Sequence, residues 1–174
     1  MTEDEMRQHR CCFTGHREHK LHRSEDEIRK DLEEAILLAI KGGFTTFITG
    51  MATGVDIWAG EIVLELKRQH PDLKLIAAVP FEGFEKSWDN DWQKRYHTLL
   101  ERADLVQYIC SHYANYAFQK RNEWMVNHSS RVIAVFNGDA GGTRNTIQYD
   151  MKKAVPVELW QDEKLLQLTN TNHN

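Results

Sequence analysis

The chain has 174 residues, of which 41% are hydrophobic and 28% are charged, and its formal net charge is −4 at pH 7. These values are typical of one globular domain that is long enough to bury a core, and the acidic balance argues against nucleic acid as a partner. No apolar run reaches membrane-spanning length and the N-terminal segment MTEDEMRQHR has no apolar signal core, so we expect a cytoplasmic protein without membrane contact.

Apolar runs of strand length alternate along the chain with stretches of helical period. The first helix is expected to begin after Ser24, which forms a capping box with Glu27, and to end at Gly42 and Gly43. Strands are expected at residues 10–15, 44–49, 73–80, 104–110, 131–136 and 154–160, and helices at residues 24–43, 55–69, 88–102, 117–127 and 143–153.

This alternation predicts a single doubly wound, Rossmann-like α/β domain. Right-handed crossovers would give a mainly parallel sheet with helices on both faces. The runs LIAAVP and VIAVF are continuously apolar, as expected of strands that are covered on both sides. We assign residues 1–9 to a flexible N-terminus, residues 10–160 to the domain and residues 161–174 to a polar C-terminal tail.

Three cysteines, Cys11, Cys12 and Cys110, lie in apolar, strand-like runs. Two of them are adjacent, which is a poor basis for a disulfide framework. We therefore expect reduced, buried thiols in a cytosolic protein.

Ligands bind at the carboxyl ends of parallel strands, so the loops that follow the strands are the candidate site. After the first strand, Thr14 and Gly15 allow close backbone approach, and His16 and Arg17 supply a titratable ring and a fixed cation. After the second strand, the turn TGMATGVD leads into a helix whose first N–H groups attract an anion such as a phosphate.

In that second loop, Gly50 and Gly54 flank a turn of small residues that includes Thr53. Asp56, in the first turn of the helix, can cap it or reach a ribose hydroxyl. The histidines His16 and His19, with His22 three residues further on, have no acid or thiol ligands nearby. We predict no metal site and no cofactor.

A second glycine-bearing junction lies at Gly141 and Gly142. There the backbone can approach a ligand closely, and Thr143 can cap the following helix. On the preceding helix, Arg121 and Asn122 could add a bidentate cation and an amide.

The third loop and helix carry aromatic residues at a spacing of four, namely Trp88, Trp92 and Tyr96. An aromatic stripe of this period favours a place in the core. A stacking wall for a base, or a dimer contact, is the alternative.

The stretches CCFTGHREHKL, ITGMATGVDIWA, FQKRNEWMV and GDAGGTRNTI, in this order and spacing, resemble the SLOG superfamily of Rossmann-like proteins. The resemblance runs from about Arg10 to Leu159 and is closest to the YpsA/YoqJ-like branch of bacterial proteins of unknown function. The superfamily also includes DprA and the LOG-type phosphoribohydrolases. The resemblance implies a pocket for a nucleotide or nucleotide sugar. The candidate ligand-binding residues are Thr14, Gly15, His16, Arg17, Gly50, Thr53, Gly54, Asp56, Arg121, Asn122, Gly141, Gly142 and Thr143.

One part of the LOG-type pattern is absent. LOG-type enzymes carry an arginine that Arg121 matches and a PGGxGTxxE run with a catalytic glutamate. In the corresponding stretch, NGDAGGTRNT, residues 144–146 occupy the glutamate region. Cleavage of an N-glycosidic bond needs a carboxylate near its oxocarbenium-like transition state. Asp56 or Glu82 would have to supply it, so these two and Arg121 are the catalytic candidates.

Three hypotheses follow. The leading one is a protein that binds a nucleotide or nucleotide sugar, as a sensor or regulator. The second is an N-glycosidase or phosphoribohydrolase of the LOG type that acts on nucleotide monophosphates. The third is an interaction module that forms a homodimer through the aromatic helix.

Overall fold

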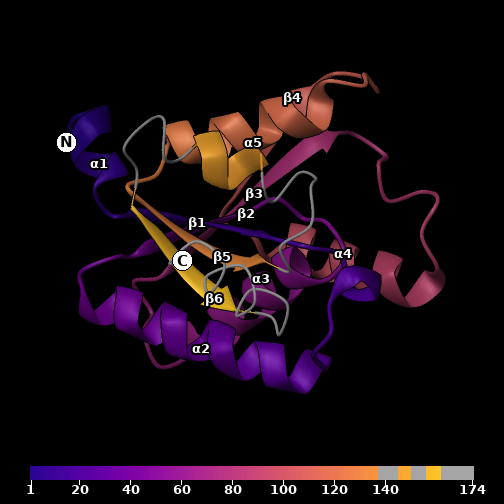
Figure 1. Cartoon of the computed structure of the whole chain (residues 1–174). Coiled ribbons are helices and arrows are strands. Elements are labelled where there is room, and N and C mark those ends of the chain that lie inside the picture. The colour runs from indigo at the N-terminus through magenta and orange to yellow at the C-terminus, as the bar shows by residue number, and fades with distance from the viewer. Residues whose placement is uncertain (137–144, 150–155, 162–174) are drawn as a thin grey trace, which may run out of the picture.

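The computed structural model describes residues 1–136, 145–149 and 156–161. Strands and helices alternate along these residues (Figure 1). The strands are β1 (Arg10–Gly15), β2 (Thr46–Thr49), β3 (Lys74–Phe81), β4 (Leu105–Cys110), β5 (Arg131–Phe136) and β6 (Val157–Gln161). The helices are α1 (Glu3–Arg7), η1 (Glu18–Lys20), α2 (Glu25–Lys41), α3 (Val55–Leu66), α4 (Asn90–Arg102) and α5 (Ala117–Asn127), and residues 145–149 are also helical.

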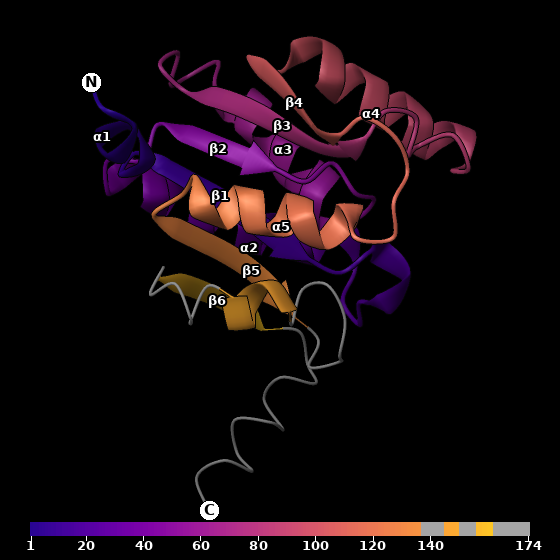
Figure 2. The same cartoon turned by 90° about the horizontal axis from the view of Figure 1, so that it is seen from above.

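The six strands form one parallel sheet in the order β4-β3-β2-β1-β5-β6 (Figure 2). From β1 the chain moves outward to the edge strand β4, and α5 then carries it back across the sheet to β5. The strand order therefore reverses between β1 and β5, and the predicted single, doubly wound, Rossmann-like domain is confirmed. In such folds, ligands bind beside the carboxyl ends of the strands at this reversal.

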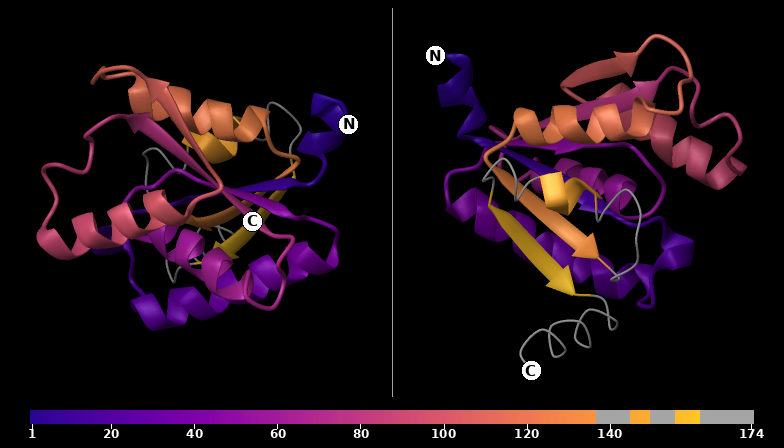
Figure 3. Two further views of the ribbon diagram at one scale, coloured as in Figure 1. Left: turned by 180° about the vertical axis from the view of Figure 1, so that it is seen from behind. Right: turned by 45° about the horizontal axis from the view of Figure 1, so that its top comes forward.

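Helices cover both faces of the sheet. Alternate strand residues point to opposite sides, so that Cys11 and Phe13 of β1 pack with α2, α3 and α4, whereas Cys12 packs against α5. Figures 1 and 3 show α2 and α3 on one side of the sheet and α5 on the other. The apolar runs of β3 and β5 are buried on both faces, as predicted.

Side-chain capping explains where α2 and α4 begin. The Ser24 hydroxyl accepts a hydrogen bond from the N–H of Glu27 at 3.3 Å, which is the first bond of the predicted capping box. The Glu27 carboxylate accepts from Arg23 rather than from the Ser24 N–H, so the second bond is not seen in the described residues. The predicted helix start at Trp88 is wrong by two residues. The Asp89 side chain accepts from the N–H of Trp92 and caps α4, which begins at Asn90.

The sequence predicts no helix in residues 1–9, yet α1 forms there. Its N-cap, Thr2, and Glu5 form a complete capping box.

Two further predictions concern the state of the cysteines and the absence of a membrane-spanning segment. No disulfide joins the three cysteines, all of which lie in the described residues, and Cys11 and Cys12 are buried. Cys110 is partly exposed because β4 is an edge strand. In the described part of the chain, no helix combines the length and the apolar character that crossing a membrane requires.

Candidate functional site

A cavity of about 290 Å³ lies beside the carboxyl end of β1, next to the reversal of strand order. Seven of the ten candidate ligand-binding residues within the described part of the chain line it. The lining residues are Phe13, Thr14, Gly15, His16, Arg17, Lys20, Ala52, Asp56, Phe118, Arg121 and Asn122. The site that strand ends predict is therefore a real hollow, made by the β1 loop, the start of α3 and one face of α5.

The β1 loop is held against α3 by close contact. A Cβ atom added to Gly15 would lie 2.5 Å from Cβ of Val55, so only glycine lets α3 pack this closely on β1. At the end of the strand, the ring of His16 stacks on Phe136 of β5 with centroids 5.8 Å apart. His16 thus links the two strands between which the order reverses.

The glycine turn before α3 has a structural role of its own. Gly54 has a φ of +87°, and a Cβ there would lie 2.7 Å from the backbone nitrogen of Glu18 and 2.8 Å from the carbonyl oxygen of His16. The N–H of Val55 points to that same carbonyl at 3.5 Å, and the N–H of Ile57 donates to Ala52 at 3.2 Å. Two of the first N–H groups of α3 are thus used within the protein, and a phosphate at this helix end stays a prediction.

Thr49 joins the turn before α3 to the first turn of that helix, which carries Asp56. Its hydroxyl donates to the backbone carbonyl of Asp56 at 2.7 Å and accepts from the N–H of Met51 at 3.3 Å. Met51 has a φ of 65°, an uncommon conformation for a residue other than glycine. Thr49 therefore holds this turn closed against the start of α3.

Asp56 and Arg121 are the two buried charges of the cavity, and both lie close to Gly50. A Cβ at Gly50 would be 2.8 Å from Oδ2 of Asp56 and 3.1 Å from Nε of Arg121. Arg121 donates from Nη1 to the Gly50 carbonyl at 2.8 Å and from Nε to Oδ1 of Asn122 at 3.1 Å. Asp56 accepts from the N–H of Ala52 at 3.3 Å. Although both side chains are buried, they form no ion pair with each other.

Burial dominates the titration of both groups. It raises the pKa of Asp56 to about 6, although the charges of Arg121 and Arg17 and the Ala52 hydrogen bond act in the opposite direction. Burial likewise lowers the pKa of Arg121, against the attraction of Asp56. A guanidinium stays protonated under any physiological condition, so the cavity holds a fixed cation beside a carboxyl group that titrates near neutral pH.

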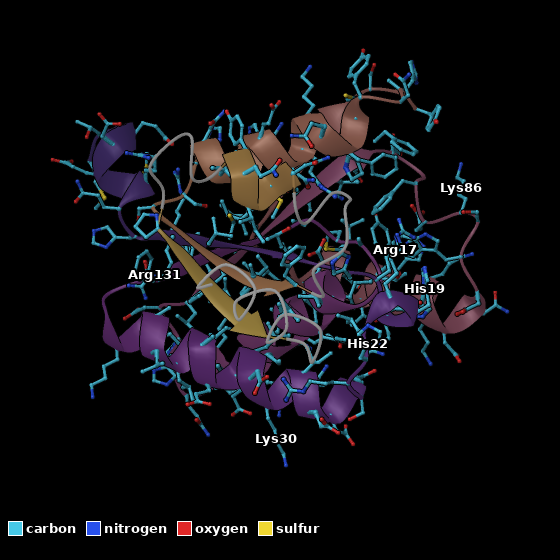
Figure 4. The ribbon with its side chains drawn as sticks, viewed as in Figure 1. Arg17, His19, His22, Lys30, Lys86 and Arg131 are labelled. Atoms are coloured by element: carbon cyan, nitrogen blue, oxygen red, sulfur yellow. The ribbon has the colours of Figure 1, made fainter. Side chains whose placement is uncertain are left out.

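Arg17 brings a further cation to the cavity. Its Cζ lies 5.8 Å from the centre of the Trp88 ring, and it forms no hydrogen bond or ion pair with the described residues. Lys20 lines the same cavity. Figure 4 shows Arg17 on the same side of the molecule as His19 and His22. The described residues contain no group of side chains suited to a metal ion.

Several predicted residues lie elsewhere. Gly50, Thr53 and Gly54 do not line the cavity, although Gly50 lies next to its two buried charges. Glu82 is exposed and does not line it either. The second glycine junction, at residues 141–143, is outside the described residues.

The aromatic residues of the third loop face inward. Tyr96 is buried, and Trp88 and Trp92 pack against the same core, in agreement with the core interpretation. The Trp88 ring makes edge contacts with the rings of Phe84 and Tyr96. The ring centroids of Trp92 and Trp58 are 6.2 Å apart.

Sequence reasoning missed Phe118 and Lys20 as parts of the cavity wall. Phe118 lies one helical turn before Arg121 on α5, with its ring 5.9 Å from Cζ of that arginine. The spacing of three residues between Phe118 and Arg121 was the available signal, because residues at this spacing share one face of a helix.

A match over residues 11–172 decides the family. The chain belongs to the YspA SLOG family. Its relatives include a UPF0398 protein of Halalkalibacterium halodurans, 33% identical over 139 residues that make up 75% of this chain and 74% of the relative. The SPbeta prophage-derived protein YoqJ of Bacillus subtilis is 37% identical over 127 residues, which are 66% of this chain and 74% of that protein. The predicted resemblance is confirmed.

Solved structures share the fold of this SLOG protein at low sequence identity. DprA of Helicobacter pylori superposes with a TM-score of 0.67 and 17% identity, covering 98% of this chain and 75% of that chain. DprA of Streptococcus pneumoniae superposes with a TM-score of 0.61 and 15% identity. The superposition covers 90% of this chain and about half (51%) of that DprA chain. The molybdenum cofactor binding protein of Rippkaea orientalis gives 0.59 and 21%, covering 96% of this chain and 85% of that chain.

Proposed function

We propose that the cavity binds a nucleotide or nucleotide sugar, and that the protein acts as a sensor or regulator of that ligand. The observation that carries the proposal is the pair of buried, opposite charges that share one cavity without pairing with each other. Burying two charges is costly unless each finds a partner. A ligand with both acidic oxygens and hydroxyl groups would supply both partners at once.

Each lining group suits one part of such a ligand. A phosphate fits the positive side, where Arg17 has no carboxylate partner among the described residues and Lys20 lies beside it. The Asp56 carboxylate can accept hydrogen bonds from sugar hydroxyls. Arg121, with N–H groups beyond those bonded to Gly50 and Asn122, can donate to ligand oxygens.

Isothermal titration calorimetry and thermal shift provide the test, with AMP, ADP-ribose, NAD and inorganic phosphate as probes. A ligand at about 100 times its dissociation constant should add about 2.7 kcal/mol to the free energy of unfolding. No binding by any probe would overturn the proposal.

A matched pair of variants locates the site. Arg17→Ala removes a cation that lines this cavity and should weaken binding about tenfold, the effect of one charge-assisted hydrogen bond. Arg68→Ala removes an exposed arginine that lines a different hollow, between α2, α3 and α4, and should leave affinity unchanged. Equal losses in the two variants would place binding outside the cavity.

One observation favours N-glycosidic hydrolysis as the second function. Asp56 is the carboxyl group that lines the described cavity, and its pKa of about 6 lies close to a working pH. Such a group can protonate a leaving base or stabilise an oxocarbenium-like sugar. Incubation with nucleotide monophosphates tests this function. Free base that appears with the natural chain and not with Asp56→Asn supports it, and unchanged substrate after long incubation contradicts it.

A further inference from the structure

The side of α2 that faces away from the sheet carries a shallow, partly apolar hollow of about 370 Å³. We call this surface the α2 outer face; its residues are Lys30, Glu33, Glu34, Leu37, Leu38 and Lys41. At 100° per residue these positions lie opposite the buried stripe of the same helix. Leu37 is 40% exposed and Leu38 is 49% exposed. In Figure 4, Lys30 points away from the body of the molecule.

The charges of this face have no ion-pair partner among the described residues. The flanks of the same helix differ, because Arg23 pairs with Asp31 and Arg29 bonds to Glu61 at 2.8 Å. Two exposed leucines surrounded by charges of both signs, two lysines and two glutamates, form a surface with no net charge. Such a surface can associate without long-range repulsion.

We propose that the α2 outer face is a homodimer contact, in which α2 of one copy packs antiparallel on α2 of a second copy. A two-fold axis that passes between Leu37 and Leu38 brings the four leucines of the two copies together. Glu34 and Lys41 lie three and a half residues on either side of this axis. Glu34 of each copy therefore lies at the level of the partner's Lys41, and the two ion pairs form at once.

This self-complementarity is the reason to choose a second copy over another partner. An isologous contact requires that one patch match itself after the two-fold rotation. Here the rotation places leucine against leucine and glutamate against lysine. A single helix from each copy makes a small interface, so the dimer should be weak and concentration-dependent. The ligand cavity is built from the strand-end loops and α5, so α2 pairing leaves it open.

Charge reversal tests the contact, with sedimentation equilibrium over a range of protein concentrations as the measurement. Glu34→Lys places lysine against lysine twice, and Lys41→Glu places glutamate against glutamate twice. Each should raise the dimer dissociation constant about tenfold. The double variant with both reversals restores opposite charges and should regain the natural affinity. An equimolar mixture of the two single variants should form a heterodimer, because each reversed charge then meets its opposite.

The controls lie on α4, where Lys94 and Glu101 are exposed at the same spacing of seven residues. Lys94→Glu and Glu101→Lys change the net charge by the same amounts and should leave the dissociation constant unchanged. Leu38→Glu puts a carboxylate at the axis and should abolish the dimer, with circular dichroism confirming that the fold is intact. A natural chain that stays monomeric at every concentration overturns the proposal, as does a dimer whose affinity the double reversal does not restore.

Discussion

Asp56 and Arg121 are both buried against Gly50 and form no ion pair with each other. Arg121 instead donates to the carbonyl of Gly50, while Asp56 accepts from the N–H of Ala52. The fold thus keeps a cation and a titratable carboxyl group facing one cavity. Such an arrangement lowers stability and is characteristic of sites that a ligand completes.

Replacement of Asp56 by asparagine should stabilise the protein at neutral pH. An Asp in the unfolded chain titrates near a pKa of about 3.9, whereas Asp56 in the fold has a pKa of about 6. Between these values the folded state binds more protons, so the free energy of unfolding falls as pH rises from about 4 to about 6. The penalty is complete above that window, where the Asp56→Asn substitution should add up to about 3 kcal/mol.

Urea unfolding of both chains at pH 4 and pH 7.5 measures this effect. The difference between the chains should be small at pH 4 and largest at pH 7.5. If Asp56→Asn instead lowers stability at pH 7.5, the carboxylate is a net stabilising group and the burial argument is wrong.

Gly50 should not tolerate a methyl group. In Gly50→Ala the new Cβ would press on Oδ2 of Asp56 and Nε of Arg121, so one charged side chain must move. We expect a loss of about 1–3 kcal/mol, the usual effect of overpacking, together with weaker ligand binding. Gly42→Ala, whose Cβ would make only ordinary contact at 3.4 Å, should change stability by less than about 0.5 kcal/mol. Thermal unfolding with equal losses in the two variants would contradict the packing argument.

Alanine at Gly54 and alanine at Gly43 should differ in their cost, because only Gly54 is in close contact with other residues. Both have positive φ, +87° and +97°, but a Cβ at Gly43 would meet no atom within 4 Å, whereas at Gly54 it would meet the backbone of residues 16–18. Gly43→Ala should cost about 1 kcal/mol, from conformation alone. Gly54→Ala should cost clearly more, because its φ of 87° with a ψ of −130° suits glycine alone and because the backbone atoms of residues 16–18 cannot turn aside. Denaturant unfolding measures the free energy of unfolding of the two variants. Similar losses of stability would show that the close contact at Gly54 is unimportant.

The elements that sequence predicted best have strong local signals. Residues 10–15, 117–127 and 131–136 form β1, α5 and β5 with the predicted limits. The two strands are apolar runs flanked by polar or turn-forming residues. The start of α4 was misplaced because the aromatic spacing extends to Trp88, while the true signal is the capping side chain of Asp89. Capping also explains α1, which the sequence analysis did not assign.

For the candidate site, too, some features have a sequence signal and others depend on tertiary packing. Strand ends predicted that Thr14, His16 and Arg17 would gather near Asp56, because the carboxyl ends of parallel strands share one edge. The contact of Arg121 with Gly50 joins residues 71 positions apart, and no local pattern contains it. The sequence predicts a turn at Gly54, but the close approach of this turn to the β1 loop depends on tertiary packing and has no local signal.

Thr49 should be needed to hold the turn before α3 against the first turn of the helix, which carries Asp56. Thr49→Val preserves the shape of the side chain but removes the hydroxyl that joins the Asp56 carbonyl to the N–H of Met51, leaving two buried backbone groups without that partner. We expect a loss of about 1–3 kcal/mol. Thr98→Val, which removes an exposed hydroxyl bonded to Lys94 on α4, should be nearly neutral. Amide hydrogen exchange adds a local readout. Exchange at Met51 should accelerate in Thr49→Val relative to Thr98→Val, and unchanged protection there would show that the hydroxyl does not hold the turn closed.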